Sequence, residues 1–272
     1  MILTPVIQIL LALTFTASVN HSAEITWKEL DKGLYFTETE APIKSDIGNS
    51  KITILKIDPA YFHFNLISSK EKQSKNTTAV KWAEKENLIA VVNAGMFHLD
   101  FETNVGYMKN YEFVNNGNLN NDNTILAFNR KTDTVPEVQI IDLKCQEWSV
   151  LSKAYHSYTQ GIRMIDCNQK NRWSQQDKRF SIVCIAVDKD GFVLFIFSRS
   201  PYSGHDLINN LLTLPLNLHN AMYLEGGPEA SIYITNNGFK FGAMGSFETD
   251  FNENDNNNRF WDIPNVIGIV KK

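Results

Sequence analysis

A glutamate that ends an apolar run and precedes two glycines is the clearest candidate for chemistry in this sequence. Glu225 follows residues 221–224, a run that predicts the end of a buried strand, and Gly226 and Gly227 come next. Glycine adopts positive φ angles and lets other groups approach the backbone, so Gly226 and Gly227 are candidate substrate-binding positions. A carboxylate at such a junction is held by a rigid element yet faces a cleft, as sites acting on sugars or phosphates require. Glu225 is therefore the candidate catalytic carboxylate, as nucleophile, general base or electrostatic stabiliser; its alternative role is to tie down the glycine turn.

A second carboxylate and a second glycine turn extend this candidate site. Glu229 lies shortly after Glu225 and could share the cleft, giving the two carboxylates that glycosidases use; exposure at the surface is the interpretation we favour. Upstream, the apolar run 88–92 leads into Asn93 and Gly95. Asn93 could offer its amide to a sugar hydroxyl or a phosphate, and Gly95 could let a ligand approach the backbone. Taken singly, either motif is also an ordinary strand-to-turn junction.

Two arginines and a glutamine are candidates for holding a phosphate. The arginine guanidinium is a planar fork that binds phosphate through two hydrogen bonds. Arg163 lies in an otherwise apolar strand, so it faces either the cleft or solvent. Arg179 just precedes a buried strand and could clamp phosphate or pair with the nearby Asp177. Gln160 could bind a sugar or phosphate through its amide.

His205 and Asp206 form the remaining titratable pair. His205 could protonate a leaving oxygen or bind phosphate, or it could be a loop residue. Asp206 could assist it or cap a helix over residues 207–214. The six histidines show no zinc-site spacing, and we predict no metal and no other cofactor. The asparagine-rich stretches 115–123 and 252–258 are each interpreted as a hairpin or a surface loop rather than a calcium site, since a calcium site needs several charged oxygens.

Five motifs occur in an informative order: residues 93–97, 159–164, 179–181, 204–207 and 223–227. Together they resemble the phosphodiester glycosidase family, which includes the lysosomal uncovering enzyme acting on N-acetylglucosamine phosphodiesters and many secreted bacterial relatives. The resemblance extends over residues 51–270. The family's last motif is usually Leu-Asp-Gly-Gly followed by small hydroxyl residues. Here Glu225 stands at the aspartate position and Ser231 is the hydroxyl residue that remains.

The resemblance implies a hydrolase that cleaves the glycosidic C–O bond of a sugar-1-phosphate diester, whether a small molecule or a polysaccharide. It implies Glu225 as the key carboxylate, Arg163 and Arg179 on the phosphate, and Asn93 and Gln160 on sugar or phosphate. Two other functions remain open. The chain could be a non-catalytic carbohydrate-binding envelope protein on the same fold, because fold does not fix function. It could also be a phosphodiesterase that cleaves the P–O bond.

The pattern of apolar residues predicts an α+β fold: a single domain with an extensive mixed β-sheet and few helices. Alternating residues at 33–37, 50–57 and 62–67 indicate half-buried strands, and a helical pattern extends from residue 78 to residue 87. The Asp-Lys-Asp-Gly sequence at 188–191 predicts a hairpin between two apolar strands. Further strands are expected at 88–92, 124–129, 138–143, 231–235 and 266–270.

Composition limits the location and partners of the protein. Of 272 residues, 43% are hydrophobic, which is ample for a sizeable core, and the net charge is −4 without a basic block, so we expect no nucleic-acid partner. Residues 1–23 are interpreted as a signal peptide and 24–272 as the mature domain. We therefore expect a secreted or periplasmic protein with no stable membrane span. Cys145 and Cys167 could form a disulfide, and Cys184 is expected to be an inert core thiol.

Overall fold

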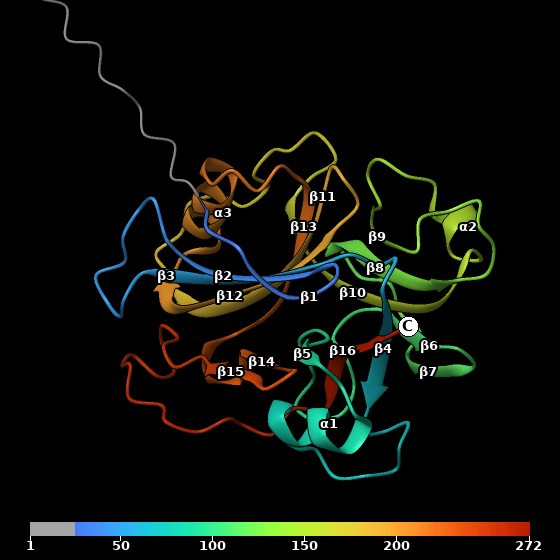
Figure 1. Cartoon of the computed structure of the whole chain (residues 1–272), viewed down its shortest axis with the longest axis horizontal. Helices are drawn as coiled ribbons and strands as arrows, with labels where there is room; N and C mark the ends of the chain where they lie inside the picture. The colour runs from blue at the N-terminus through green and yellow to red at the C-terminus, as the bar shows by residue number, and fades with distance from the viewer. Residues whose placement is uncertain (1–24) are drawn as a thin grey trace, which may run out of the picture.

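Two β-sheets and three short helices make up residues 25–272, which a computed structural model describes (Figure 1). The expected α+β class, with much sheet and few helices, is confirmed. The predicted signal peptide at 1–23 lies outside the described residues. Among residues 25–272, no helix has the length and apolar character needed to cross a membrane.

The larger sheet has eleven strands and carries the candidate site. Its main path runs β1-β2-β3-β12-β11-β13-β10-β6-β7, and β8 pairs with both β10 and β9. In chain order these strands are β1 (Lys28–Asp31), β2 (Leu34–Glu40), β3 (Lys51–Ile57), β6 (Met108–Asn110), β7 (Phe113–Asn116), β8 (Asn123–Arg130), β9 (Val138–Asp142), β10 (Tyr155–Ile165), β11 (Phe180–Asp188), β12 (Val193–Tyr202) and β13 (Leu218–Gly226).

The smaller sheet has five strands in the order β15-β14-β5-β16-β4. They are β4 (Phe62–Ser68), β5 (Ala90–Asn93), β14 (Ser231–Asn236), β15 (Phe239–Met244) and β16 (Asn265–Lys271). We expected a mixed sheet, whereas the strand pairs within residues 25–272 are all antiparallel. The physical reason is that short hairpins join many consecutive strands, and a hairpin permits only antiparallel pairing. The predicted hairpin at 188–191 is one of them, joining β11 to β12.

The two sheets pack face to face, and a helix covers each outer face (Figure 1). Strand β11 shows how the sequence produces this layering. Val183 and Ile185 point into the core between the sheets, while Cys184 and Ala186 point into the core under α3 (Gly204–Thr213). Successive side chains of a strand alternate between faces, so an apolar run serves both cores. Helix α1 (Ala79–Glu86) covers the smaller sheet, and α2 (Trp148–Leu151) is a single turn near β10.

Two local predictions need correction. Helix α3 begins at Gly204 rather than at residue 207, and its cap is not Asp206. The Ser203 side chain accepts a hydrogen bond from the Asp206 N–H at 3.1 Å, so Ser203 caps the helix and Asp206 lies in its first turn. The stretch 115–123 is a loop rather than a hairpin: Asn116 ends β7 and Asn123 begins β8, but β7 pairs with β6 while β8 pairs with β9 and β10. Residues 252–258 form no helix or named strand, as expected.

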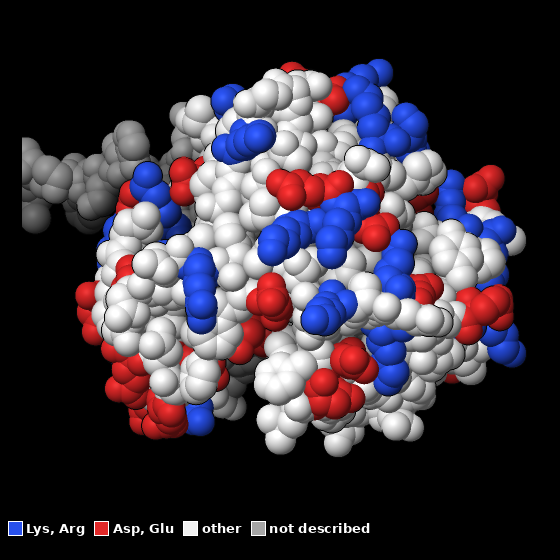
Figure 2. Space-filling model, turned by 90° about the horizontal axis from the view of Figure 1, so that it is seen from below, with Lys and Arg blue, Asp and Glu red and all other residues white. Residues whose placement is uncertain are grey.

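The three cysteines have two different roles. Cys145 and Cys167 form a disulfide, so the pairing left open by the sequence is present. Cys184 is fully buried in the core under α3, as predicted, and burial raises the pKa of its thiol. On the face of the molecule shown in Figure 2, Lys and Arg side chains are interspersed with Asp and Glu. That no nucleic acid binds stays a prediction.

Candidate functional site

A cleft of about 570 Å³ opens where β10 and β13 lie side by side. Its position follows from strand register, because Ile162 of β10 pairs with Tyr223 of β13 and both side chains face the α3 side of the sheet. The loop before β8 and the segment between β10 and β11 form the rest of its wall. The lining residues are Met96, Asn121, Asp122, Asn123, Ile162, Arg163, Arg172, Trp173, Gln176, Lys178, Phe180 and Tyr223.

Three aromatic rings form one wall of the cleft. The Trp173 ring centroid lies 5.7 Å from that of Tyr223 and 6.4 Å from that of Phe180, and Tyr223 and Phe180 meet edge to face at 5.8 Å. The Trp173 indole N–H donates to the Arg163 carbonyl oxygen at 2.9 Å, which fixes the ring against β10. A rigid aromatic wall with a few polar groups is typical of small-ligand sites, and its flat faces suit the C–H face of a sugar ring.

Three glutamates gather at the Tyr223 and Phe180 end of this cleft. Glu225 lies two residues beyond Tyr223 on β13, and the pairing with β11 shifts in register between them. The charge of Glu225 helps to raise the pKa of Tyr223, so the two side chains lie close together. Its Oε1 accepts a hydrogen bond from the Gly226 N–H at 3.0 Å. Glu229 ends the 3₁₀ turn Gly227–Glu229, and Glu248 pairs with Phe180 through an isolated β-bridge. Glu229 is only partly exposed, so our preference for a surface position was wrong.

The two glycines after Glu225 make room for site side chains. A Cβ at Gly226 would lie 2.3 Å from the Tyr223 hydroxyl oxygen. A Cβ at Gly227 would lie 2.3 Å from Glu248 Oε2, and Gly227 also has a φ of +62°. No side chain fits at either distance, so glycine is required at both positions for the tyrosine and the glutamate to approach. The sequence suggested instead that these glycines admit a ligand.

Crowding of the carboxylates changes their protonation. Burial, assisted by the charges of Glu229 and Glu248, raises the pKa of Glu225 from 4.5 to about 8. Burial, together with the charge of Glu248, raises the pKa of Glu229 from 4.5 to about 7. The pKa of Glu248 is also raised by burial, and the positive charge of Lys178 opposes this change. At neutral pH, Glu225 therefore holds its proton more firmly than Glu229 does.

The raised pKa of Glu225 predicts a dependence of stability on pH. The unfolded chain ionises this group near pH 4.5, while the folded protein keeps it protonated up to about pH 8, so stability is lost as pH rises across that interval. We expect Glu225→Gln to be more stable than the wild type by roughly 2 kcal/mol at pH 9 and nearly equal to it at pH 4.5. Thermal unfolding at both pH values measures this. Glu84→Gln, at an exposed position of α1, is the matched control; equal melting temperatures of Glu225→Gln and wild type at pH 9 would contradict the prediction.

The two candidate arginines occupy different places. Arg163 lines the cleft, and its Nη1 lies 3.0 Å from Oδ1 of the fully buried Asp142. Arg179 is not among the cleft-lining residues; its Nη1 pairs with Asp46, and its guanidinium lies 5.7 Å from the centre of the Phe247 ring. The alternative partner that we considered for Arg179, Asp177, is therefore wrong.

Three predicted substrate-binding residues are engaged within the protein. Asn93 is buried; its amide nitrogen donates to the Glu229 carbonyl at 3.0 Å and its oxygen accepts from the Ser231 N–H at 2.8 Å. Gly95, with a φ of +150°, leaves space for Asn104, whose Oδ1 would lie 2.5 Å from a Cβ there. Asn93 thus joins β5 to the turn that carries Glu229.

Gln160 is buried as well. Its Oε1 accepts hydrogen bonds from the Tyr107 and Asn120 N–H groups at 2.9 and 3.2 Å, and its Nε2 donates to the Asn120 carbonyl at 3.0 Å. These contacts fix the loop before β8, which forms part of the cleft wall. Gln160 therefore supports the cleft wall through hydrogen bonds to the backbone and does not itself line the cleft.

His205 and Asp206 lie in the first turn of α3, outside the lining of the cleft. His205 Nδ1 is 3.3 Å from Asp206 Oδ1. Burial alone would raise the pKa of Asp206, but hydrogen bonds from Gln175, Ser203 and His205 leave it below its usual value. Asp206 is thus ionised and held by its neighbours.

Several residues of the site had no role in the sequence analysis. Tyr223 could have been found, since it precedes Glu225 by two positions in a strand. Trp173 and Lys178 lie in a polar segment without periodicity, and Glu248 lies in a long segment between β15 and β16. Only the folded chain brings these side chains to Glu225.

A family model for phosphodiester glycosidases matches residues 86–270. This range includes the cleft and all three glutamates, and it begins after strands β1–β4. The chain belongs to the phosphodiester glycosidase family. No curated protein matches its sequence.

Two solved structures share the fold. A hypothetical protein from Synechocystis has a TM-score of 0.62 and 13% identity, over 93% of this chain and 64% of its own, so this chain spans slightly less than two thirds of it. The catalytic domain of zebrafish N-acetylglucosamine-1-phosphodiester alpha-N-acetylglucosaminidase, auto-inhibited by its pro-peptide, has a TM-score of 0.61 and 13% identity, over 94% of this chain and 86% of its own. At this identity the likeness concerns the fold alone.

Proposed function

We propose that the protein hydrolyses the C–O bond between a sugar and the phosphate of a sugar-1-phosphate diester. The observation that carries this proposal is the composition of one cleft. Its lining combines an aromatic wall for a sugar with Arg163 for a phosphate, and a group of carboxylates around Glu225 adjoins it beside Tyr223 and Phe180. These three features match the three parts of the substrate, namely the ring, the charged diester and the anomeric carbon.

The unequal pKa values suggest how the carboxylates divide the reaction. Cleavage places positive charge on the anomeric carbon and leaves an electron pair on a phosphate oxygen. Glu225, which holds its proton up to about pH 8, would protonate that departing oxygen. Glu229, with a pKa of about 7, would stabilise the cationic carbon and accept a proton from the attacking water. Arg163 would hold the diester, while Asn93 and Gln160 would keep the turn and the wall in place.

This division of roles predicts a narrow, bell-shaped pH profile of kcat/KM. Activity should fall above about pH 8, where Glu225 loses its proton, and below about pH 7, where Glu229 gains one. Assays from pH 5 to pH 10 measure both limbs. Glu229→Gln should lower the rate and abolish the acidic limb, whereas a wild-type rate that stays constant from pH 5 to pH 10 would contradict these assignments.

Hydrolysis in water labelled with heavy oxygen tests the proposed bond. The substrate is an N-acetylglucosamine-1-phosphate diester, and mass spectrometry locates the label in the products. Label in the sugar means C–O cleavage and supports the proposal. Label in the phosphate means P–O cleavage by a phosphodiesterase. Binding without turnover, seen as a thermal shift, would favour a carbohydrate-binding protein.

The disulfide bears on where this reaction would take place. Disulfides persist in oxidising compartments and are rare in a reducing cytoplasm. The Cys145–Cys167 bond therefore supports our expectation of a secreted or periplasmic protein. A substrate there would be a small glycosyl phosphate or a polysaccharide carrying glycosyl-phosphate linkages.

A further inference from the structure

Asp142 is a buried carboxylate that ends β9 directly behind the cleft. It has no exposed surface, and backbone groups hold both of its oxygens. Oδ1 accepts a hydrogen bond from the Lys144 N–H at 2.9 Å, and Oδ2 accepts one from the Cys167 N–H at 3.3 Å. A carboxylate fixed in this way cannot turn out into solvent, so its position is set by the backbone around it.

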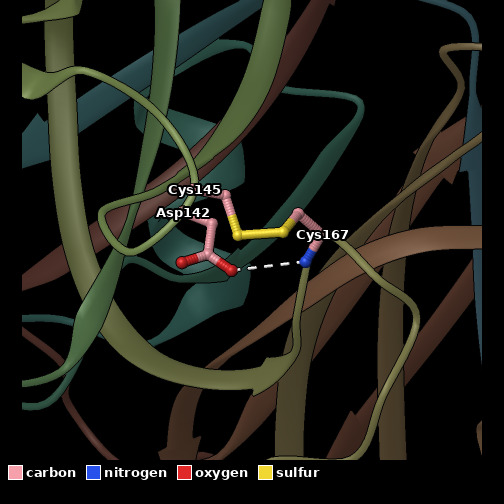
Figure 3. Close-up of side chains that lie close together, drawn as sticks. All are labelled: Asp142, Cys145 and Cys167. Carbon is pink, nitrogen blue, oxygen red and sulfur yellow. Dashed lines mark hydrogen bonds between the residues drawn. A yellow bond between two sulfur atoms is a disulfide. The ribbon is translucent and has the colours of Figure 1, made fainter.

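The disulfide holds one of these backbone donors in place. Cys145 lies in the turn after β9, and Cys167 lies just beyond β10, so the bond joins the ends of two strands. Figure 3 shows the Asp142 carboxylate beside the disulfide, with a hydrogen bond to the Cys167 nitrogen. These three residues are close enough together to suggest a metal site, but both sulfurs are bonded to each other and offer no thiolate.

The third contact of Asp142 leads into the cleft. Arg163 Nη1 lies 3.0 Å from Oδ1 and 3.3 Å from Oδ2 of Asp142. Among the described residues, the hydrogen bonds of the Arg163 side chain all use Nη1. Nε and Nη2 therefore remain for a ligand, and the side chain, 18% exposed, borders the cleft. One edge of the guanidinium is anchored, and the donors on its other positions are left for binding an anion.

We propose that Asp142, held by the Cys145–Cys167 disulfide, is a positioning residue that orients Arg163 toward the phosphate of the substrate. The inference rests on the proposed function for the identity of the anion. A freely rotating arginine must be immobilised when a ligand binds, and each such side chain weakens binding by a factor of about 3 to 10. Asp142 immobilises Arg163 before the ligand arrives.

The Asp142 charge also has an opposing effect. It partly neutralises Arg163, so its removal would strengthen attraction between the cleft and an anion. Two observations favour orientation as the larger effect. Asp142 contacts Nη1 and leaves the other guanidinium nitrogens available, and the backbone N–H groups of Lys144 and Cys167 share its negative charge. The sign of the change in affinity therefore separates the two effects.

A double-mutant cycle tests the inference. Calorimetry gives the Kd of inorganic phosphate and of N-acetylglucosamine-1-phosphate for the wild type, Asp142→Asn, Arg163→Gln and the double variant. We expect Asp142→Asn to weaken binding about 3- to 10-fold, and to have no further effect once Arg163 is replaced. Unchanged or tighter binding in Asp142→Asn, equal losses in both backgrounds, or a wild type that binds neither probe would overturn the inference. Asp133→Asn, which removes an exposed partner of Arg130, is the matched control.

Reduction of the disulfide provides a second test if Asp142→Asn does not fold. Cys184 is a free thiol and is already reduced, so a mild reductant acts on the Cys145–Cys167 pair. Reduction should weaken binding of both probes in the wild type and leave Arg163→Gln unaffected; equal affinities before and after reduction of the wild type would overturn the part assigned to the disulfide. The labelled-water experiment stays independent of this test. Label in the phosphate would refute the proposed function, while the binding cycle would still decide whether Asp142 orients Arg163.

Discussion

The Glu225→Gln variant is expected to hydrolyse a sugar-1-phosphate diester about 100- to 10,000-fold more slowly than the wild type. Glutamine keeps the size of the side chain and can still accept the Gly226 N–H hydrogen bond, but it has no proton of suitable acidity to give to the leaving oxygen. The loss should appear in kcat rather than in KM, because the proton is needed only as the bond breaks. Steady-state kinetics with a single diester substrate measures both constants.

The same substitution should leave the protein folded, and this separates chemistry from structure. We expect Glu225→Gln to be stabilised at alkaline pH, since an unfavourable buried charge is removed. A variant that is inactive but more stable at alkaline pH would show that Glu225 contributes to activity and lowers the stability of the folded protein. Full activity in Glu225→Gln would refute its catalytic role. Glu84→Gln should match the wild type in rate.

Local patterns in the sequence were sufficient for most of the fold. The alternation in β3 and β4 and the apolar runs of β11 and β12 predicted strands close to those observed. These patterns succeed because side chains alternate between the two faces of a strand. They fail where a residue outside the element decides its end, as at α3. There Ser203 starts the helix earlier than its apolar pattern indicates.

Less of the candidate site was predictable, for a physical reason. Glu225 and Arg163 were found because each interrupts an apolar run. Glu248 and Asp142 were not, because their importance arises from contacts between segments distant in sequence: Glu248 with the turn at Gly227, and Asp142 with Arg163. Sequence spacing carries no information about such contacts. It also placed Asn93 and Gln160 on the ligand, whereas their amides bond to the backbone of neighbouring segments.

Gly245→Ala is expected to destabilise the protein by about 3 kcal/mol or more. A Cβ at Gly245 would lie 1.9 Å from the Gly227 carbonyl oxygen and 2.8 Å from the Ser181 Cβ. Neither neighbour is the end of a flexible side chain, so backbone must move to accommodate the methyl group. A melting temperature lower by about 10 °C in thermal unfolding would match this loss. Gly117→Ala is the control, because its nearest contact would be an ordinary 3.7 Å to Val114.

The substitution should also impair activity in the molecules that remain folded. Gly245 begins the segment that leads to Glu248, and its N–H donates to the Ala230 carbonyl at 2.8 Å. Displacing this segment would move Glu248 away from Gly227 and loosen the turn that carries Glu229. Because Glu248 contributes to the raised pKa values of Glu225 and Glu229, both values should fall and the pH optimum should shift downward. A loss of stability with an unchanged pH profile would contradict this second expectation. It would show that the close approach of Gly245 to Gly227 supports the fold but does not affect the pKa values of Glu225 and Glu229.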